Sequence, residues 1–174
     1  MTAASVGRPP AKARLVRTGP TDRVVLRDHL RRALLETKAD PSLCLALLLL
    51  RVKAERAEVE GPDPIAQLRD RLRNAVRCKP WRGRRDLVAW LGGGEFAILT
   101  APLNGIRDAE RIAGRLLALA AGSPQQEGEA VLPRLAIGIA AVDRRDRRAE
   151  EFLARARRAL KKAEKVGMGW AMET

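Results

Sequence analysis

The sequence predicts an α+β fold, with a central, mainly antiparallel sheet of about five strands flanked by helices. Two observations lead to this prediction. Short apolar runs bounded by turn residues alternate with segments whose apolar residues recur at helical spacing. Two of these runs also surround the glycine triplet 92–94, which is the pattern of a β-hairpin. The chain has 174 residues and is 46% hydrophobic, enough for one folded core.

The first half of the chain predicts a helix, a strand and a second helix. Residues 18–22 have turn and helix-capping chemistry, and helical periodicity follows over 24–36. Residues 43–52 are almost wholly apolar, which predicts a central strand covered on both faces. A second amphipathic helix is expected over 65–76, followed by a basic loop over 78–85.

The second half predicts the hairpin and two further helix and strand segments. The hairpin strands are expected over 87–91 and 96–100. An amphipathic helix is expected over 106–121, a strand over 132–142, and a helix over 150–166 that a glycine ends. Helices therefore alternate with mainly antiparallel strands.

The sequence divides into a basic tail, one domain and a short end. Residues 1–17 carry four positive charges, no negative charge and two prolines, so we expect a flexible basic tail. The domain is expected over 18–170. Residues 171–174 form the C-terminal end.

Charge is the most unusual property of the composition. The chain has 34 Lys and Arg against 21 Asp and Glu, a net charge of +13, and 27 of the 34 cations are Arg. A balance this basic favours an anionic partner, such as a nucleic acid, a nucleotide, an anionic lipid or an acidic protein face. A GC-rich genome that supplies Arg codons is the alternative explanation.

The composition also excludes several kinds of site. Two cysteines, Cys44 and Cys78, are too few for a disulfide framework or a four-cysteine zinc site. His29 is the sole histidine, which excludes a multi-histidine metal centre. The longest apolar run, 43–50, is far shorter than a membrane span. We therefore expect a cytoplasmic protein without a cofactor or a bound metal.

Residues 87–99, Leu-Val-Ala-Trp-Leu-Gly-Gly-Gly-Glu-Phe-Ala-Ile-Leu, resemble the signature hairpin of the GGDEF domain family, the diguanylate cyclases. Three further blocks, at 18–23, 135–140 and 153–167, resemble family motifs and occur in the family's order. The resemblance covers roughly 18–170. It implies a GGDEF or palm-like fold and a chemistry in which metal ions help to join two GTP molecules into cyclic di-GMP.

The resemblance also indicates that both metal carboxylates are missing. The position of the first-strand carboxylate falls on Arg51, and the third letter of the signature falls on Gly94. Magnesium requires oxygen ligands, which neither residue offers. Glu95 remains, and the degenerate signature comprises Gly92, Gly93, Gly94, Glu95 and Phe96. We therefore expect no catalytic residues, no metal and no enzymatic activity.

A second family site binds the product and inhibits the enzyme. Asp86 keeps that site's spacing before the signature, while Gly83 stands where the family has Arg. Because Asp can accept from the guanine edge and Arg can bind guanine or phosphate, cyclic di-GMP is the candidate ligand. The candidate residues are Asp86, Arg82, Arg85, Arg77 and Arg115. A solvated basic loop, in which Asp86 only offsets local charge, is the alternative.

The sequence therefore predicts a catalytically inactive, GGDEF-like signalling or adaptor domain that acts through protein–protein contacts. Cyclic di-GMP is a candidate ligand, and the resemblance leaves a homodimer open. Two alternatives remain. One is a basic nucleic-acid-binding protein on the same fold, which no recognised nucleic-acid motif supports. The other is an active diguanylate cyclase.

Overall fold

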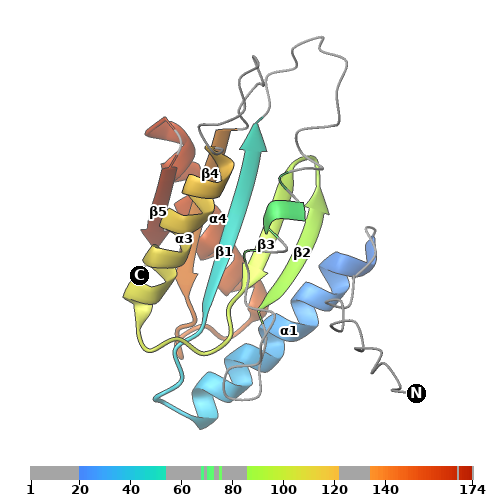
Figure 1. The fold of residues 1–174 in the computed structure, drawn as a ribbon. Coiled ribbons are helices and arrows are strands. Elements are labelled where there is room, and N and C mark those ends of the chain that lie inside the picture. Colours follow the sequence, from blue (N-terminus) through green and yellow to red (C-terminus); the bar gives the residue numbers. More distant parts are fainter. Residues whose placement is uncertain are drawn as a thin grey trace, which may run out of the picture.

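The computed structural model describes residues 20–53, 68, 70–72, 75, 86–121, 134–167 and 169–173. Figure 1 shows a sheet between layers of helices. The labelled elements are α1 (Pro20–Ala39), β1 (Ala46–Lys53), β2 (Leu87–Gly92), β3 (Glu95–Leu99), α3 (Ile106–Ala120), β4 (Arg134–Ala141), α4 (Ala149–Lys165) and β5 (Gly169–Glu173). Of the helix expected over 65–76, residues 68, 70–72 and 75 are described, and they are helical. In the described part of the chain, every helix is too short or too polar to cross a bilayer.

The sheet has five strands in the order β2-β3-β1-β4-β5. β1 pairs antiparallel with β3 and with β4, and β2 pairs antiparallel with β3. The predicted α+β class and the mainly antiparallel sheet are confirmed.

The fifth strand is a feature that the sequence analysis did not locate. β5 lies parallel to β4, with Trp170 opposite Ile137, and forms one edge of the sheet. Gly167, at φ 94°, follows the end of α4 and precedes this strand. β5 has only five residues and follows a helix directly, so its sequence contains too little alternation to predict a strand.

β1 is the central strand and is covered on both faces, as predicted. Leu47 and Leu49 belong to one buried cluster, and Leu48 and Leu50 belong to the other. All four are 0% exposed. The strand alternates its side chains between two apolar layers, which explains its continuous leucine run.

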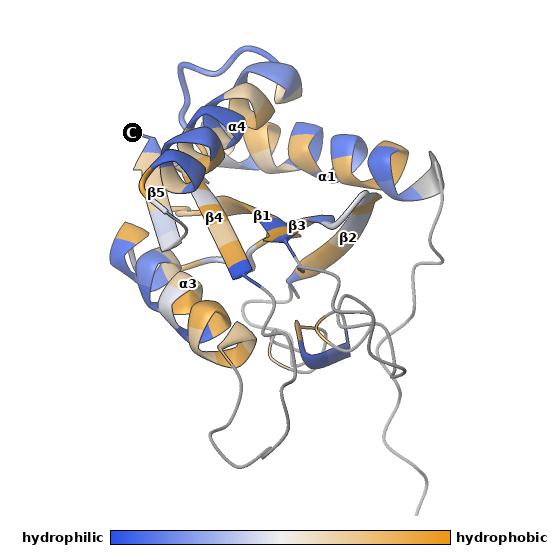
Figure 2. Ribbon diagram, turned by 90° about the horizontal axis from the view of Figure 1, so that it is seen from above, coloured by the Kyte–Doolittle hydropathy of each residue, from blue (hydrophilic) through white to orange (hydrophobic). Residues whose placement is uncertain are grey.

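α1 and α4 cover one face of the sheet, and α3 covers the other (Figure 2). The first face packs Leu30 of α1 and Phe152 of α4 against β1 and its neighbours. The second packs Leu116 of α3, together with Leu72, against the opposite side. Each helix therefore buries one apolar stripe against the sheet.

Gly138 permits a close approach between α4 and β4. A Cβ at this position would lie 2.2 Å from the backbone nitrogen of Leu160 and 2.4 Å from the carbonyl oxygen of Ala156. A contact below 3.0 Å with backbone atoms cannot be relieved by a side-chain movement. The helix backbone therefore rests directly on the strand where glycine interrupts the apolar run.

An ion pair fixes the turn between β4 and α4. Arg155 pairs with Asp146, and both side chains are nearly buried, at 12% and 8% exposed. Arg155 Nη2 also donates to the carbonyl oxygen of Ala141 at 2.6 Å, and its guanidinium lies 5.6 Å from the centre of the Phe152 ring. These contacts hold the start of α4 against the end of β4.

Candidate functional site

The signature hairpin joins β2 and β3 through three glycines with positive φ. Gly92, Gly93 and Gly94 have φ values of 88°, 59° and 76°. This left-handed conformation favours glycine because it has no Cβ. Gly92 is the register partner of Glu95, and Trp90 is the partner of Phe96. The predicted strand, glycine turn and strand are confirmed.

Gly94 contacts the end of β1 through its backbone. The N–H of Val52 donates to the carbonyl oxygen of Gly94 at 2.9 Å. A Cβ on Gly94 would lie 2.8 Å from the carbonyl oxygen of Val52. The backbone at this position is therefore fitted to glycine, and a longer side chain would have to move β1 or the turn.

Arg51 and Glu95 face each other between β1 and β3. They are register partners, and Arg51 Nη2 donates to Glu95 Oε2 at 2.9 Å. The two side chains are 38% and 17% exposed. The guanidinium of Arg51 is therefore hydrogen-bonded to one of the two carboxylate oxygens of Glu95, the acidic residue of the signature.

No cluster of three or more His, Cys, Asp or Glu side chains that could hold a metal ion occurs among the described residues. The Arg51–Glu95 contact is consistent with this, since a cation stands beside the carboxylate. The Nε of Arg51 is buried and has no hydrogen-bond partner among the described residues.

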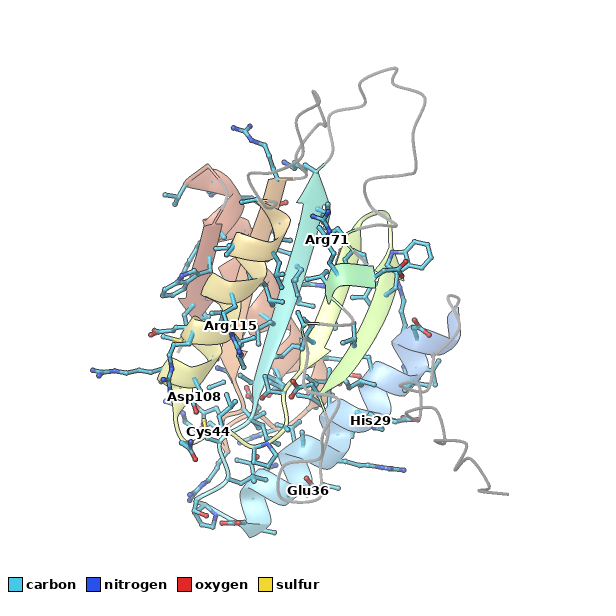
Figure 3. The ribbon with its side chains drawn as sticks, viewed as in Figure 1. His29, Glu36, Cys44, Arg71, Asp108 and Arg115 are labelled. Atoms are coloured by element: carbon cyan, nitrogen blue, oxygen red, sulfur yellow. The ribbon has the colours of Figure 1, made fainter. Side chains whose placement is uncertain are left out.

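Two of the five candidate cyclic di-GMP residues lie in the described part of the chain. Asp86 immediately precedes β2, and Arg115 lies on the exposed side of α3 (Figure 3). Arg77, Arg82 and Arg85 lie outside the described residues. The grouping of all five therefore stays a prediction.

Asp86 has a structural contact that the sequence analysis missed. Its Oδ1 accepts a hydrogen bond of 2.6 Å from the backbone N–H of Ala101, beyond the end of β3. Leu87 and Leu99 are register partners, so Asp86 fastens the open end of the hairpin. No pattern in the sequence indicates such a side-chain to backbone contact.

Cys44, which precedes β1, lies in surroundings that disfavour a reactive thiol. Cys44 is a free cysteine, and its backbone forms an isolated β-bridge with Leu103. Burial of the thiol, and to a lesser extent the charge of Asp108, raises the pKa of Cys44. A raised pKa disfavours the reactive thiolate. His29 is half-buried on α1.

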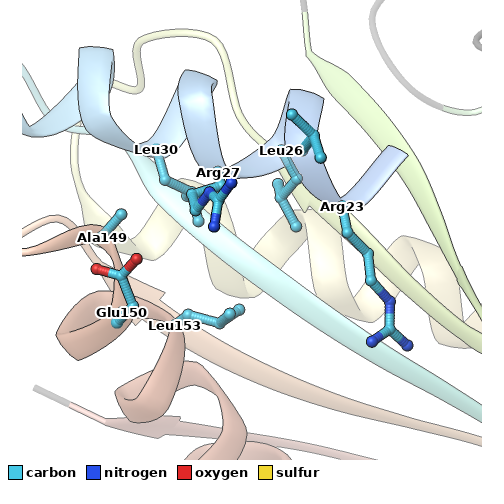
Figure 4. Close-up of a pocket in the computed structure, with 8 residues that line it drawn as sticks. Arg23, Leu26, Arg27, Leu30, Ala149, Glu150 and Leu153 are labelled. Carbon is cyan, nitrogen blue, oxygen red and sulfur yellow. The ribbon is translucent and has the colours of Figure 1, made fainter. Parts of the chain in front are cut away.

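A groove between α1 and the start of α4 forms a cavity that the sequence did not indicate (Figure 4). Its volume is about 150 Å³. The lining residues include apolar Leu26, Leu30 and Leu153 and the charged Arg23, Arg27 and Glu150. Arg23 Nη2 also donates to the carbonyl oxygen of Leu91 at 2.8 Å, which ties α1 to the hairpin.

The chain is similar to known diguanylate cyclases. The family model described as "Diguanylate cyclase, GGDEF domain" matches residues 60–169. The diguanylate cyclase TpbB of Pseudomonas aeruginosa is 45% identical over 67 residues, which are 38% of this chain and 15% of TpbB. The chain therefore matches only a small part of that relative's length.

Solved structures show the same fold over most of the chain. The GGDEF domain of TpbB from Pseudomonas aeruginosa matches with a TM-score of 0.65 and 26% identity, covering 87% of this chain and 89% of that one. The diguanylate cyclase SiaD of Pseudomonas aeruginosa, solved in complex with its activator SiaC, matches with a TM-score of 0.60 and 18% identity. That match covers 83% of this chain and 55% of SiaD.

These matches correct the expectation that the chain is not an enzyme. That expectation rested on Arg51 and Gly94 at the metal positions, but the family that matches is an enzyme family. The family model covers more than half of the 174 residues, in the same region that carries the glycine hairpin. The chain belongs to the GGDEF domain family of diguanylate cyclases.

Proposed function

We propose that this GGDEF domain acts in cyclic di-GMP signalling as an adaptor, and that its contribution comes chiefly from binding. The observation that carries the proposal is the contact between Arg51 and Glu95 at the signature hairpin. In this arrangement the Arg51–Glu95 pair limits metal-dependent GTP chemistry.

The physical reason is the competition between Arg51 and a metal ion for one carboxylate. Mg²⁺ binds oxygen ligands in near-octahedral geometry and usually needs one or two carboxylates beside phosphate oxygens. Glu95 Oε2 is 2.9 Å from the Arg51 guanidinium, so a metal ion at this oxygen would have to displace a charge-assisted hydrogen bond. It would also lie close to a positive charge.

Two further points support a binding role. SiaD, a structural neighbour, was solved with an activator protein bound. For this chain we propose protein contacts of the same general kind, together with cyclic di-GMP binding at Asp86, Arg115, Arg77, Arg82 and Arg85. A carboxylate and guanidinium groups suit the guanine edges and phosphates of that ligand.

A turnover experiment with a matched control tests the role of the pair. GTP conversion to cyclic di-GMP is measured with Mg²⁺ for the wild type, Arg51→Ala and Arg157→Ala. Arg157 is an exposed cation on α4, so its removal changes net charge equally without touching the hairpin. We expect slow turnover in the wild type, tighter Mg²⁺-dependent GTP binding in Arg51→Ala, and no change in Arg157→Ala.

Rapid Mg²⁺-dependent turnover by the wild type, unaffected by Arg51→Ala, would contradict the proposal. Calorimetry with cyclic di-GMP tests the binding role separately. Binding that weakens in Arg115→Ala supports it. The absence of heat at tens of micromolar protein and ligand would remove the ligand from the proposal.

A further inference from the structure

β5 forms one edge of the sheet and has a strand neighbour on one side only. It pairs with β4, and the order of the strands ends there. Figure 2 shows β5 at this edge, with α4 on one face of the sheet and α3 on the other. An edge strand presents backbone N–H and C=O groups on its outer side. Among the described residues, no hydrogen bond other than those of the β4 ladder reaches the β5 backbone.

The opposite edge of the sheet, β2, is covered by α1. Arg23 Nη2 donates to the carbonyl oxygen of Leu91 at 2.8 Å, and Asp22 Oδ2 accepts from the backbone N–H of Trp90 at 3.2 Å. Side chains of α1 therefore satisfy backbone groups of β2. At β5, by contrast, the side chains of α4 bond to the carboxylate of Glu173 and leave the strand's backbone free for another partner.

The sequence of β5 lacks the features that usually protect an edge strand. Edge strands in native proteins are often protected by lysine, proline or a bulge. The five residues of β5 are Gly-Trp-Ala-Met-Glu, and their pairing with β4 has no register shift. Trp170 is 43% exposed, and Val166, shortly before the strand, is 85% exposed. A regular edge strand with an exposed tryptophan is suited to binding a further strand.

The two faces of β5 differ in their chemistry. Trp170 and Met172 share one face because side chains alternate along a strand, and Met172 packs against the buried cluster under α3. Ala171 packs against the cluster under α1 and α4. Glu173 shares that second face and bonds to two cations of α4. A strand added beside β5 would therefore have an apolar side toward α3 and a charged side toward α4.

The α4 side of this edge carries an excess of positive charge. Arg158, Lys162 and Lys165 are spaced so that they follow one side of the helix, and all three are exposed. Glu173 accepts from Arg158 Nε at 3.1 Å and from Lys162 Nζ at 2.5 Å, which places this side of α4 beside β5. Within the described chain, Lys165 has no ion pair. Three cations therefore share one carboxylate.

We propose that the outer edge of β5 binds an extended segment of an acidic partner protein as an additional strand, with apolar and acidic side chains in alternation. Backbone hydrogen bonds to β5 hold such a segment. Its acidic side chains face Lys162 and Lys165, and its apolar side chains face Trp170. The inference rests on the proposed function for the role of protein contacts, and it names the kind of partner.

Charge favours this partner over a second copy of the chain. If β5 paired antiparallel with the β5 of another copy, the two α4 helices would lie on the same face of the joined sheet. The cationic sides of both helices would then meet at one interface, in a chain whose net charge is +13. Like charges brought together in this way oppose association. An acidic segment reduces the positive charge instead.

The test measures how the full chain binds a labelled, end-capped peptide of alternating valine and glutamate, long enough to pair with all five residues of β5. Fluorescence anisotropy compares the wild type with Lys165→Glu and with the matched control Arg157→Glu. Arg157 is also an exposed cation of α4, but it lies about 100° around the helix from Arg158. We expect binding to weaken about fivefold or more in Lys165→Glu and less than about twofold in the control.

Two further measurements locate the peptide. Trp170→Ala should weaken binding roughly tenfold, because it removes the apolar anchor. Hydrogen exchange should show added protection of the β5 amides in the wild type, and a peptide of alternating valine and lysine should not bind. If Trp170→Ala unfolds at a lower temperature, Lys165→Glu still decides the matter, since Lys165 is exposed and precedes the strand.

Several results would overturn the proposal. These are an equal loss of affinity in Lys165→Glu and Arg157→Glu, added protection confined to segments other than β5, and no binding at millimolar peptide. A concentration-dependent dimer that Trp170→Ala abolishes would assign this edge to a second copy and overturn the acidic partner.

The outcome is separable from that of the proposed function. The peptide is titrated without nucleotide and without Mg²⁺, so its binding measures the β5 edge alone. Failure there removes strand addition at β5 and leaves the results for Arg51→Ala turnover and Arg115→Ala cyclic di-GMP binding as they stand. Peptide binding by a wild type that turns GTP over rapidly would keep the β5 edge and contradict the adaptor role.

Discussion

Gly94 and Val52 hold the signature hairpin against the central strand through two backbone groups. The N–H of Val52 donates to the carbonyl oxygen of Gly94 at 2.9 Å, and the carbonyl oxygen of Val52 lies 2.8 Å from where a Cβ of Gly94 would be. These contacts fix the position of the hairpin turn beside the end of β1. Arg51, the residue before Val52, then faces Glu95, the residue after Gly94.

Substitution of Gly94 should destabilise the domain. Gly94→Ala must adopt φ 76° and place its Cβ against the Val52 backbone, which we expect to lower the free energy of unfolding by roughly 2–4 kcal/mol. Gly93→Ala is the control. Its φ of 59° is also unfavourable for alanine, but the added Cβ would have no heavy atom within 4 Å other than those of its chain neighbours. It should lose about 1 kcal/mol. Urea unfolding that gives equal losses would contradict the Val52 contact.

Asp86 should contribute to stability apart from any ligand. Asp86→Ala leaves the Ala101 N–H without its acceptor, at an expected cost of about 1–3 kcal/mol. Asp86→Asn retains an oxygen acceptor and should keep most of the stability. Thermal unfolding of the two variants checks this. Asp86→Asn is therefore the variant for ligand studies, since a loss of cyclic di-GMP binding in Asp86→Ala alone would not separate binding from folding.

The leucine run of β1 should be among the most sensitive parts of the core. Replacing any one of Leu47, Leu48, Leu49 or Leu50 by Ala should lower the free energy of unfolding by about 2–5 kcal/mol, because each is 0% exposed. Leu35→Ala is the control, since Leu35 is 67% exposed and its loss should change stability by less than about 0.5 kcal/mol. Losses below about 1 kcal/mol at all four core positions would contradict the packing.

Acid should loosen β5 before the rest of the sheet. Glu173 accepts hydrogen bonds from Lys162 Nζ at 2.5 Å and Arg158 Nε at 3.1 Å, and these contacts, that of Lys162 first, lower the pKa of its carboxyl. A lowered pKa in the folded state means that the stabilisation is present above about pH 4.5. It is lost as the pH falls through the folded-state value.

Hydrogen exchange of the β5 amides measures this effect. Protection should fall with acid in the wild type, and Glu173→Gln should show weaker protection at neutral pH with little further change in acid. Acid-dependent exchange that is unchanged in Glu173→Gln would assign the effect to another group. Salt should reduce the difference, because the Arg158 and Lys162 side chains are 55% and 60% exposed.

The periodicity of the sequence was sufficient for most of the fold. The leucine run at 43–52 and the glycine triplet identified the central strand and the hairpin. A strand buried on both faces requires apolar residues, and a turn with positive φ favours glycine. β5 was missed because five residues after a helix contain almost no alternation, and its pairing with β4 is a tertiary contact. The likeness to family motifs, rather than periodicity, indicated the family.

The candidate site was less predictable. The resemblance put Arg51 and Gly94 at the metal positions and left Glu95 in the signature, but it gave no indication that Arg51 and Glu95 would bond across the strands. The role of Asp86 toward Ala101 and the opposition of Lys53 to Arg134 depend on register, which is fixed by side-chain packing over the whole sheet. Register cannot be read from either strand alone.

The close packing of α4 against Gly138 of β4 restricts where the helix can lie. The backbones of Ala156 and Leu160 lie where only glycine leaves room, so a shift of α4 along β4 would bring them against the Cβ atoms of Ala136 or Ala140 on the same face of the strand. The Arg155–Asp146 pair locks one end of the helix, and Glu173 joins its later turns to β5. The C-terminal third, from β4 to β5, is therefore a continuous unit in which α4 is anchored to both of its strands.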